Sequence, residues 1–222
     1  MDNTIELDAA DGHKFAAYLG DPGRKPKGAI VILQEIFGVN SHMRGVTDGF
    51  AAQGYFAISP ALFDRTKRGV ELGYDRAAIT AGCKLRIAVG DDGPLADIQA
   101  AINLAAKVAK VAVIGYSWGG TLAYLAATRL TSLHGAVGYY GGRIAAAVKE
   151  KTRVPVMLHF GKTDRGIPMS DVKKVREAHP EITLHVYQAG HGFNCSERGS
   201  YDTASAKIAL DRTLIFLREH IG

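Results

Sequence analysis

Cysteine is scarce in this chain of 222 residues. The two cysteines, Cys83 and Cys195, lie far apart and form no CxxC motif. This spacing excludes a dense disulfide framework and a cysteine-based zinc site, so we expect two free thiols. Long hydrophobic runs are missing too, since none approaches the roughly 20 residues needed to span a bilayer. The N-terminal segment is acidic and polar, unlike a secretory signal, and we expect a cytoplasmic protein without membrane contacts.

A strong charge of one sign is also absent. The formal net charge is +5, the sequence pI is near 9.2, and the basic residues are scattered along the chain. No stretch interleaves aromatic and basic residues as nucleic-acid-binding surfaces do, so nucleic acid is not an expected partner. Repeats, low-complexity segments and Pro/Ser-rich linkers are lacking as well. We therefore expect residues 1–222 to form one domain, long enough to bury a substantial core.

Apolar runs typical of β-strands recur along the chain. They lie at residues 28–33, 55–59, 111–115, 134–139, 154–160 and 182–187. Most of these runs show no polar alternation, which is the pattern of strands buried on both faces. Residues 4–7 and 14–19 look instead like an antiparallel hairpin at one edge of the sheet.

Helical spacing separates several of the predicted strands. One helix face is predicted over residues 95–105, and Pro94 suits the first helical position. A second helix is predicted before the C-terminus, with Asp202 as its N-cap. Its apolar face carries Leu210, Leu214, Leu217 and Ile221. This alternation of strands and helices predicts an α/β fold, with a mostly parallel sheet and helices on both faces.

Ser117 stands at the centre of a GxSxG motif, GYSWG, between a predicted strand and a helical run. This is the context in which the motif forms a nucleophile elbow. The flanking glycines let strand and helix approach without clashes between Cβ atoms. The serine hydroxyl then lies at a helix N-terminus, where backbone N–H groups stabilise developing negative charge. Because GxSxG also occurs by chance as an ordinary turn, a general base and an acid must be found elsewhere.

A base and an acid are predicted downstream of Ser117. His191 follows the strand at 182–187 and precedes the last helix, which is the place of the base in α/β-hydrolases. Asp164 follows the strand at 154–160 and is the expected acid that orients the imidazole. Asp171 is the rival acid, but we expect it to start the next helix. Four other histidines fit less well, because they lie within strands or on expected helix surfaces: His159, His185, His179 and His220.

The loop at 33–40, LQEIFGVN, follows an early strand and is predicted to complete an oxyanion hole. The backbone N–H groups of Ile36 and Trp118 are the expected pair of donors. Glu35 in this loop is either a solvated or hydrogen-bonded loop acid or an accessory group at the site. Phe37 and Trp118 are expected to form pocket walls.

Five segments follow one another in a fixed order, and QEIFGVN is the most specific of them. They read QEIFGVN, VIGYSWGGTLAYLAA, VGYYGG, HFGKTD and AGHGF. Together they resemble the dienelactone hydrolase family of the α/β-hydrolase superfamily, over nearly the whole chain. The resemblance implies a nucleophile at Ser117, an acid at Asp164 and a base at His191, with oxyanion donors at Ile36 and Trp118. It implies no metal and no organic cofactor.

The chain departs from this family in two respects. Dienelactone hydrolases usually carry a cysteine nucleophile where this chain has Ser117, so the family's role for Glu35, contact with the resting thiol, does not transfer directly. Family members that act on dienelactone hold the substrate carboxylate with two arginines. One of these positions is Cys195 here, and Arg198 is a candidate substitute. Arg76 is a candidate for the other.

The sequence therefore predicts a hydrolase of small carboxylic esters or lactones that works through an acyl-enzyme. Residues 62–93 are the candidate cover over the site. The alternatives are a thioesterase or peptidase on the same fold, and a non-catalytic protein that binds a small ligand. The expected partner is a small-molecule ester or lactone, and the chain is expected to be a monomer or a small homo-oligomer.

Overall fold

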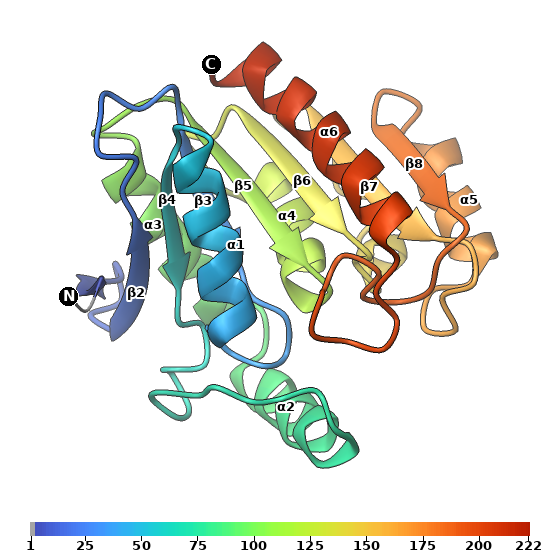
Figure 1. The fold of residues 1–222 in the computed structure, drawn as a ribbon, viewed down its shortest axis with the longest axis horizontal. Helices are drawn as coiled ribbons and strands as arrows, with labels where there is room; N and C mark the ends of the chain where they lie inside the picture. The colour runs from blue at the N-terminus through green and yellow to red at the C-terminus, as the bar shows by residue number, and fades with distance from the viewer. Residues whose placement is uncertain (1–2) are drawn as a thin grey trace.

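The computed structural model describes residues 3–222 (Figure 1). In this part of the chain eight strands form one sheet, in the order β1-β2-β4-β3-β5-β6-β7-β8. The strands are β1 (Thr4–Asp8), β2 (Lys14–Gly20), β3 (Ala29–Leu33), β4 (Phe56–Pro60), β5 (Val111–Tyr116), β6 (Gly135–Tyr139), β7 (Val156–Gly161) and β8 (Thr183–Tyr187). Strand β2 pairs antiparallel with both β1 and β4, and all other neighbours are parallel. The predicted edge hairpin and parallel sheet are confirmed.

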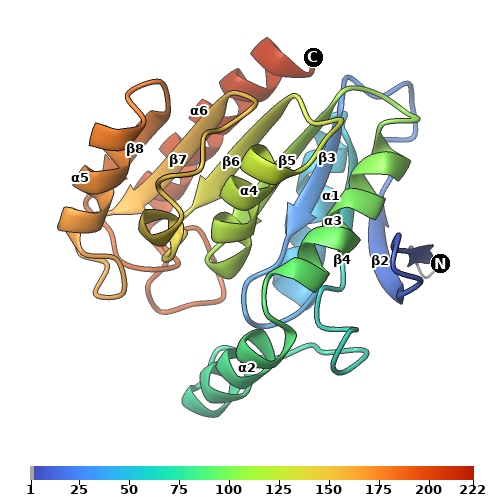
Figure 2. The same ribbon diagram turned by 180° about the vertical axis from the view of Figure 1, so that it is seen from behind.

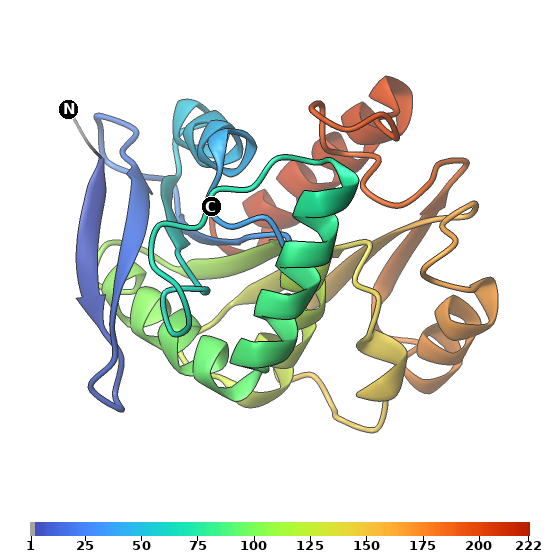
Figure 3. The same ribbon diagram turned by 90° about the horizontal axis from the view of Figure 1, so that it is seen from below.

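Helices cover both faces of the sheet, as predicted. They are α1 (Ser41–Ala52), α2 (Arg76–Val89), α3 (Asp92–Ala105), α4 (Trp118–Arg129), α5 (Met169–Ala178) and α6 (Thr203–His220), with a short 3₁₀ turn, η1 (Ile144–Ala146). Helices α1 and α6 lie on one face in Figure 1, and α3, α4 and α5 lie on the other in Figure 2. Helix α2 belongs to neither layer and lies beyond the carboxyl ends of the strands (Figure 3). Among the described helices none has the length and apolar character needed to cross a membrane.

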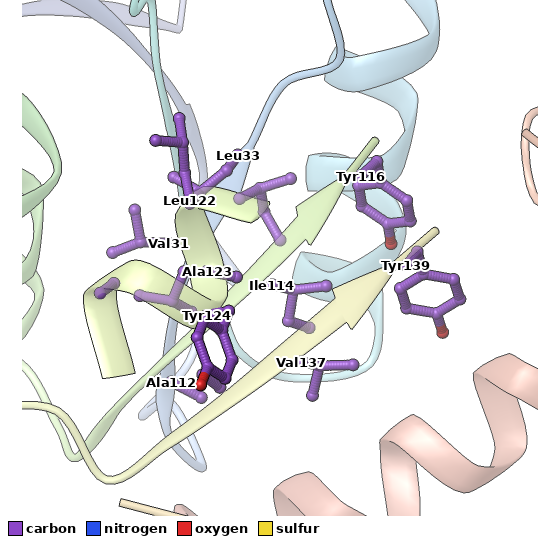
Figure 4. Close-up of a cluster of buried hydrophobic side chains, with 14 of the residues drawn as sticks. Val31, Leu33, Ala112, Ile114, Tyr116, Leu122, Ala123, Tyr124, Val137 and Tyr139 are labelled. Atoms are coloured by element: carbon purple, nitrogen blue, oxygen red, sulfur yellow. The ribbon is translucent and has the colours of Figure 1, made fainter. Parts of the chain in front are cut away.

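The core lies on both sides of the central strands. Every residue of β3, β5, β6 and β7 is buried, which explains their unbroken apolar sequences. Figure 4 shows Leu122, Ala123 and Tyr124 of α4 beside these strands. Tyr116 and Tyr139 stack with their ring centroids 4.8 Å apart. Because β5, β7 and β8 are parallel, their carboxyl ends lie at the same end of the sheet, where the loops that follow them can meet.

Two expectations about the helices were wrong in detail. Pro94 is the third residue of α3, because the helix begins at Asp92. A proline fits there because N–H groups of the first helical turn have no intrahelical acceptor. Leu210 on α6 is 39% exposed. The buried face of α6 is carried by Ser205, Ala206, Ala209, Thr213, Phe216 and Leu217. Asp202 caps α6 as predicted, accepting a hydrogen bond from the Ser205 N–H at 2.7 Å.

Candidate active site

Ser117 lies at the tight turn between β5 and α4. Its φ of 54° is in the left-handed region, which costs a non-glycine residue about 1–3 kcal/mol. A Cβ on Gly115 would lie 1.8 Å from the Gly119 carbonyl oxygen, and one on Gly119 would lie 2.4 Å from the Leu33 oxygen. The N–H of Ser117 donates to the Tyr139 carbonyl at 2.9 Å. The two glycines and this bond therefore hold the serine in a strained, fixed position above the sheet.

His191 and Asp164 meet Ser117 at this edge of the sheet. The Ser117 Oγ lies 2.9 Å from His191 Nε2, and His191 Nδ1 lies 2.7 Å from Asp164 Oδ2. The Asp164 side chain is fully buried, and its Oδ1 accepts a hydrogen bond from the Gly166 N–H at 2.7 Å. A carboxylate accepts, so Nδ1 carries the proton and Nε2 is free to accept from the serine hydroxyl. The three predicted residues thus form one continuous chain of hydrogen bonds.

The loops after β7 and β8 set the distance between the acid and the imidazole. The Lys162 N–H donates to the Tyr187 carbonyl at 2.7 Å, and the Thr163 N–H donates to the Ala189 carbonyl at 3.1 Å. On the far side of the loop, the Ser200 hydroxyl donates to the His191 carbonyl at 2.7 Å. Both loops leave adjacent parallel strands and are hydrogen-bonded to each other. These bonds hold Asp164 and His191 at hydrogen-bonding distance.

The loop after β3 lies against the N-terminus of α4. The Gly119 N–H donates to the Gln34 carbonyl at 3.1 Å, which brings residues 35–37 beside the serine. Across residues 3–222, neither the Ile36 N–H nor the Trp118 N–H has a hydrogen-bond acceptor. Both residues line the cavity above Ser117. Two unpaired donors at a helix N-terminus are suited to hold a negatively charged oxygen.

A cavity of about 280 Å³ opens above Ser117. Its walls are Ile36, Phe37, Ile79, Cys83, Arg86, Trp118, Thr121, Gly142, Arg143, Gly166, Ile167, His191 and Arg198. Helix α2 supplies three of these residues at helical spacing, so the expected cover within residues 62–93 is this helix. A Cβ on Gly82 would lie 2.1 Å from the Ile36 carbonyl oxygen. Glycine at this position therefore lets α2 rest directly on the loop that carries Ile36.

Glu35 is buried beside the cavity. Its Oε1 lies 3.2 Å from Arg198 Nη1, and the Arg198 guanidinium lies 5.6 Å from the centre of the Phe37 ring. Burial raises the pKa of Glu35, while the charge of Arg198 opposes that rise. Within the described chain, Glu35 Oε2 and the Tyr140 hydroxyl are buried without a hydrogen-bond partner. Glu35 is therefore a buried acid with one hydrogen-bonded ion-pair partner, which excludes the solvated loop acid and leaves the hydrogen-bonded one.

The other candidate residues occupy different positions. Cys195 is buried outside the cavity walls, and burial raises the pKa of its thiol to about 11. Arg76 is exposed at the first residue of α2 and does not line the cavity either. Sequence reasoning missed Arg86, although the spacing of Ile79, Cys83 and Arg86 marks one face of α2. It also missed Arg143, for which no local signal exists.

One histidine was placed wrongly. His179 was expected on a helix surface, but it is buried at the end of α5. Its Nε2 lies 3.1 Å from the Tyr124 hydroxyl and 2.7 Å from the Val148 carbonyl oxygen. These partners are far away in sequence, so local hydropathy could not reveal the burial. Within the described residues no cluster of three or more His, Cys, Asp or Glu is placed to hold a metal ion.

Comparison with known proteins places the chain in a family. The model of the dienelactone hydrolase family matches residues 15–221. The chain belongs to the dienelactone hydrolase family. A carboxymethylenebutenolidase from Pseudomonas putida is 35% identical over 224 residues, covering 96% of this chain and 94% of the relative. Another from Pseudomonas sp. strain P51 is 33% identical, with 96% and 94% covered.

Solved structures agree with this family assignment. A Klebsiella pneumoniae protein, provisionally described as a dienelactone hydrolase, is 28% identical with a TM-score of 0.83, and 98% of each chain is covered. A dienelactone hydrolase-like promiscuous phosphotriesterase from metagenomic libraries has a TM-score of 0.80 at 20% identity, covering 99% of this chain and 98% of its own, and supports the fold alone. The chain is thus a hydrolase with the α/β-hydrolase fold.

Proposed function

We propose that this hydrolase cleaves small carboxylic esters or lactones with Ser117 as nucleophile, His191 as general base and Asp164 as the acid that orients it. The observation that carries the proposal is the unbroken chain of contacts from Ser117 Oγ through His191 to Asp164, at 2.9 and 2.7 Å. A serine hydroxyl needs a base within hydrogen-bonding distance, and the base needs a partner that fixes its tautomer.

In the first half of the reaction, Ser117 Oγ attacks the substrate carbonyl carbon while His191 Nε2 takes the hydroxyl proton. The negative charge on the former carbonyl oxygen is held by the N–H groups of Ile36 and Trp118, which have no acceptor in the described chain. Collapse of this tetrahedral intermediate breaks the bond to the alcohol oxygen. His191 returns its proton to that oxygen, leaving an ester of Ser117.

In the second half, water replaces the alcohol. His191 Nε2 takes a proton from the water as its oxygen attacks the acyl carbon. The bond to Ser117 Oγ then breaks, and Oγ recovers the proton from His191. Asp164 stabilises the imidazolium that exists in both halves, without itself becoming protonated. The buried side chain of Asp164 keeps that interaction away from water.

The cavity favours small esters whose acyl and alcohol parts carry little or no charge. Its volume of about 280 Å³ lies near the lower end of ordinary ligand pockets, about 300 Å³. The name of the Pseudomonas relatives, carboxymethylenebutenolidase, denotes a lactone, which is an internal ester. In this chain Arg198 is paired with Glu35 and the expected clamp position is the buried Cys195. We therefore propose that neutral esters are cleaved at least as well as carboxylated lactones.

A fluorophosphonate probe tests the nucleophile directly. It forms a covalent bond only with an activated serine, so mass spectrometry of a digest should place the adduct on Ser117 and nowhere else. Neutral 4-nitrophenyl acetate should be hydrolysed by the same preparation, and prior labelling should abolish that activity. A panel of lactones, thioesters and peptides then ranks the alternatives. Absence of both labelling and hydrolysis would favour a non-catalytic binding protein.

A further inference from the structure

Asp91 joins three separate segments at the rim of the cavity. It is the N-cap residue of α3 and follows Gly90, the C-cap residue of α2. Its Oδ1 accepts a hydrogen bond from Trp118 Nε1 at 3.2 Å. Arg143, in the loop after β6, contacts both carboxylate oxygens, at 3.3 Å to Oδ1 and 2.6 Å to Oδ2. One carboxylate therefore ties the end of the cover helix to the nucleophile elbow and to the loop after β6.

Both partners of Asp91, Trp118 and Arg143, line the cavity, whereas Asp91 itself does not. The Asp91 side chain is only 16% exposed, while that of Arg143 is 50% exposed. The Arg143 backbone is held in place separately, because its N–H donates to Thr121 Oγ1 at 3.3 Å. The guanidinium can therefore swing toward the cavity once its carboxylate partner is removed, while the main chain stays anchored.

The cavity walls carry three arginines, and two of them are neutralised. Arg198 is paired with Glu35, and Arg143 is paired with Asp91. Arg86 has no ion-pair partner among residues 3–222. Of the three arginines, a carboxylate on a substrate would meet a free positive charge at Arg86, and the dipole of a closed ion pair at Arg143 and at Arg198. The charge that a substrate meets at Arg143 and Arg198 is thus set by two acids that do not themselves line the cavity, Asp91 and Glu35.

We propose that Asp91 is a specificity-determining residue, which masks the charge of Arg143 and so lowers the preference of the pocket for esters that carry a carboxylate. The proposal rests on the esterase function proposed above and adds the residue that tunes its substrate class. Asp91 is a positioning residue, since it acts through Arg143 and does not touch the substrate.

Asp91→Asn separates the charge of this residue from its structural contact. The asparagine Oδ1 can still accept the hydrogen bond of the Trp118 indole, but it no longer balances the guanidinium. The kcat/KM should be measured on pairs of esters that differ by one carboxylate. One pair is 4-nitrophenyl butyrate and mono-4-nitrophenyl glutarate, and the second is phenyl acetate and 4-acetoxybenzoate. These pairs place the carboxylate on the acyl side and on the alcohol side.

The expected result is a rise of about two- to fivefold in the anionic-to-neutral ratio of kcat/KM for at least one pair, through KM. The rise should become smaller in 1 M salt, because the electrostatic screening length is about 10 Å at about 0.1 M salt and about 3 Å at about 1 M salt. Arg143→Gln alone should leave the ratio near that of the wild type, because its charge is already masked. The double variant Asp91→Asn/Arg143→Gln should show an anionic-to-neutral ratio of kcat/KM close to that of the wild type. Asp92→Asn is the matched control, because this neighbouring side chain is 99% exposed.

A binding measurement makes the test independent of turnover. Trp118 is the single tryptophan of the chain, so its fluorescence reports both the contact with Asp91 and occupancy of the cavity. In a Ser117→Ala background, Asp91→Asn should tighten the binding of glutarate or benzoate by the same factor. If the wild type hydrolyses nothing, the proposed function fails and this titration still decides the role of Asp91. An equal loss of kcat on both members of each pair, or unchanged carboxylate binding, would overturn the proposal.

Discussion

The guanidinium of Arg198 lies 3.2 Å from the carboxylate of Glu35, and the acid is almost completely buried. The two residues are 163 positions apart in the sequence, and Arg198 lines the cavity while Glu35 does not. Desolvation of a carboxylate is costly, and here a single cation and one hydrogen bond compensate for it. Removal of one partner alone should therefore lower the free energy of unfolding more than removal of both partners.

Arg198→Gln should lower the free energy of unfolding by about 3 kcal/mol at neutral pH, because it leaves a buried carboxylate without its cation. Adding Glu35→Gln should recover most of this loss, which urea unfolding of the double variant measures. Burial raises the pKa of Glu35, so the native variant binds a proton more tightly than the unfolded chain. The loss in Arg198→Gln should therefore shrink as the pH is lowered.

The partly exposed pair Arg44–Glu71 provides the matched control for this experiment. Its atoms lie closer, at 2.7 Å, but the side chains are 33% and 52% exposed. Arg44→Gln should cost less than about 1 kcal/mol, because solvent already screens such pairs. Similar losses in both variants would mean that burial of Glu35 carries no special cost.

Ser117→Ala should lower kcat for 4-nitrophenyl acetate by at least about 10⁴-fold, with residual catalysis from binding and the oxyanion donors. The fold should persist, because alanine occupies the same strained φ as serine and the elbow contacts are made by the backbone. Circular dichroism melting checks the fold, and Ser170→Ala on the exposed surface of α5 is the control. Wild-type turnover in rigorously purified Ser117→Ala would refute the assignment of the nucleophile.

Gly115→Ala and Gly45→Ala should change stability in opposite directions. The new methyl group at 115 would lie 1.8 Å from the Gly119 carbonyl oxygen, so the elbow must move and stability should fall by about 3 kcal/mol or more. Gly45 lies inside α1, and apart from the helix's own nearby backbone no atom lies within 4 Å of an added Cβ, so alanine should stabilise the helix by about 1 kcal/mol. Thermal unfolding of both variants measures the contrast, and a tolerated Gly115→Ala would mean that the elbow is not sterically fixed.

The proximity of Ser117, Asp164 and His191 could be predicted from the sequence because each residue follows the carboxyl end of a strand. Parallel strands bring those ends to one end of the sheet, and the hydrogen bonds between the loops then set the distances between the side chains. The Asp91–Arg143 contact depends on the exact path of two loops, and no motif or spacing in the sequence indicates it.

On α6, small residues such as Ala206 and Ala209 pack against the sheet and Leu210 faces outward. Hydropathy alone assigns the larger residue to the core and cannot make that distinction.

His159 should make the protein less stable as the pH falls below about 6.5. Burial lowers its pKa well below the ordinary value, and the charges of His185 and Arg212 add to this effect. The unfolded chain therefore binds one more proton than the native state, and stability falls by about 1.4 kcal/mol per pH unit per such histidine. His42 and His185 have pKa values lowered by burial as well and act in the same direction.

His159→Gln should remove one proton from the uptake that accompanies unfolding between pH 6.5 and 5. Glutamine can still reach the hydroxyls of Tyr187 and Thr213, which lie 2.8 and 3.2 Å from the imidazole nitrogens. Urea unfolding at three pH values measures the slope for the wild type and the variant. An unchanged slope would assign the acid sensitivity to other groups.

Arg86→Gln should selectively weaken the cleavage of esters that carry a carboxylate. Arg86 lines the cavity from α2 and has no acidic partner in the described chain, unlike Arg143 and Arg198. A charge-assisted hydrogen bond to a carboxylate contributes roughly 1.5–3 kcal/mol, so the kcat/KM of mono-4-nitrophenyl glutarate should fall by at least about tenfold. The neutral butyrate ester should be affected far less. Arg76→Gln is the matched control on the same helix, because Arg76 is exposed and outside the cavity. Equal losses on both esters would show that Arg86 only supports α2, and a selective loss in Arg76→Gln would show that α2 presents a different face to the substrate.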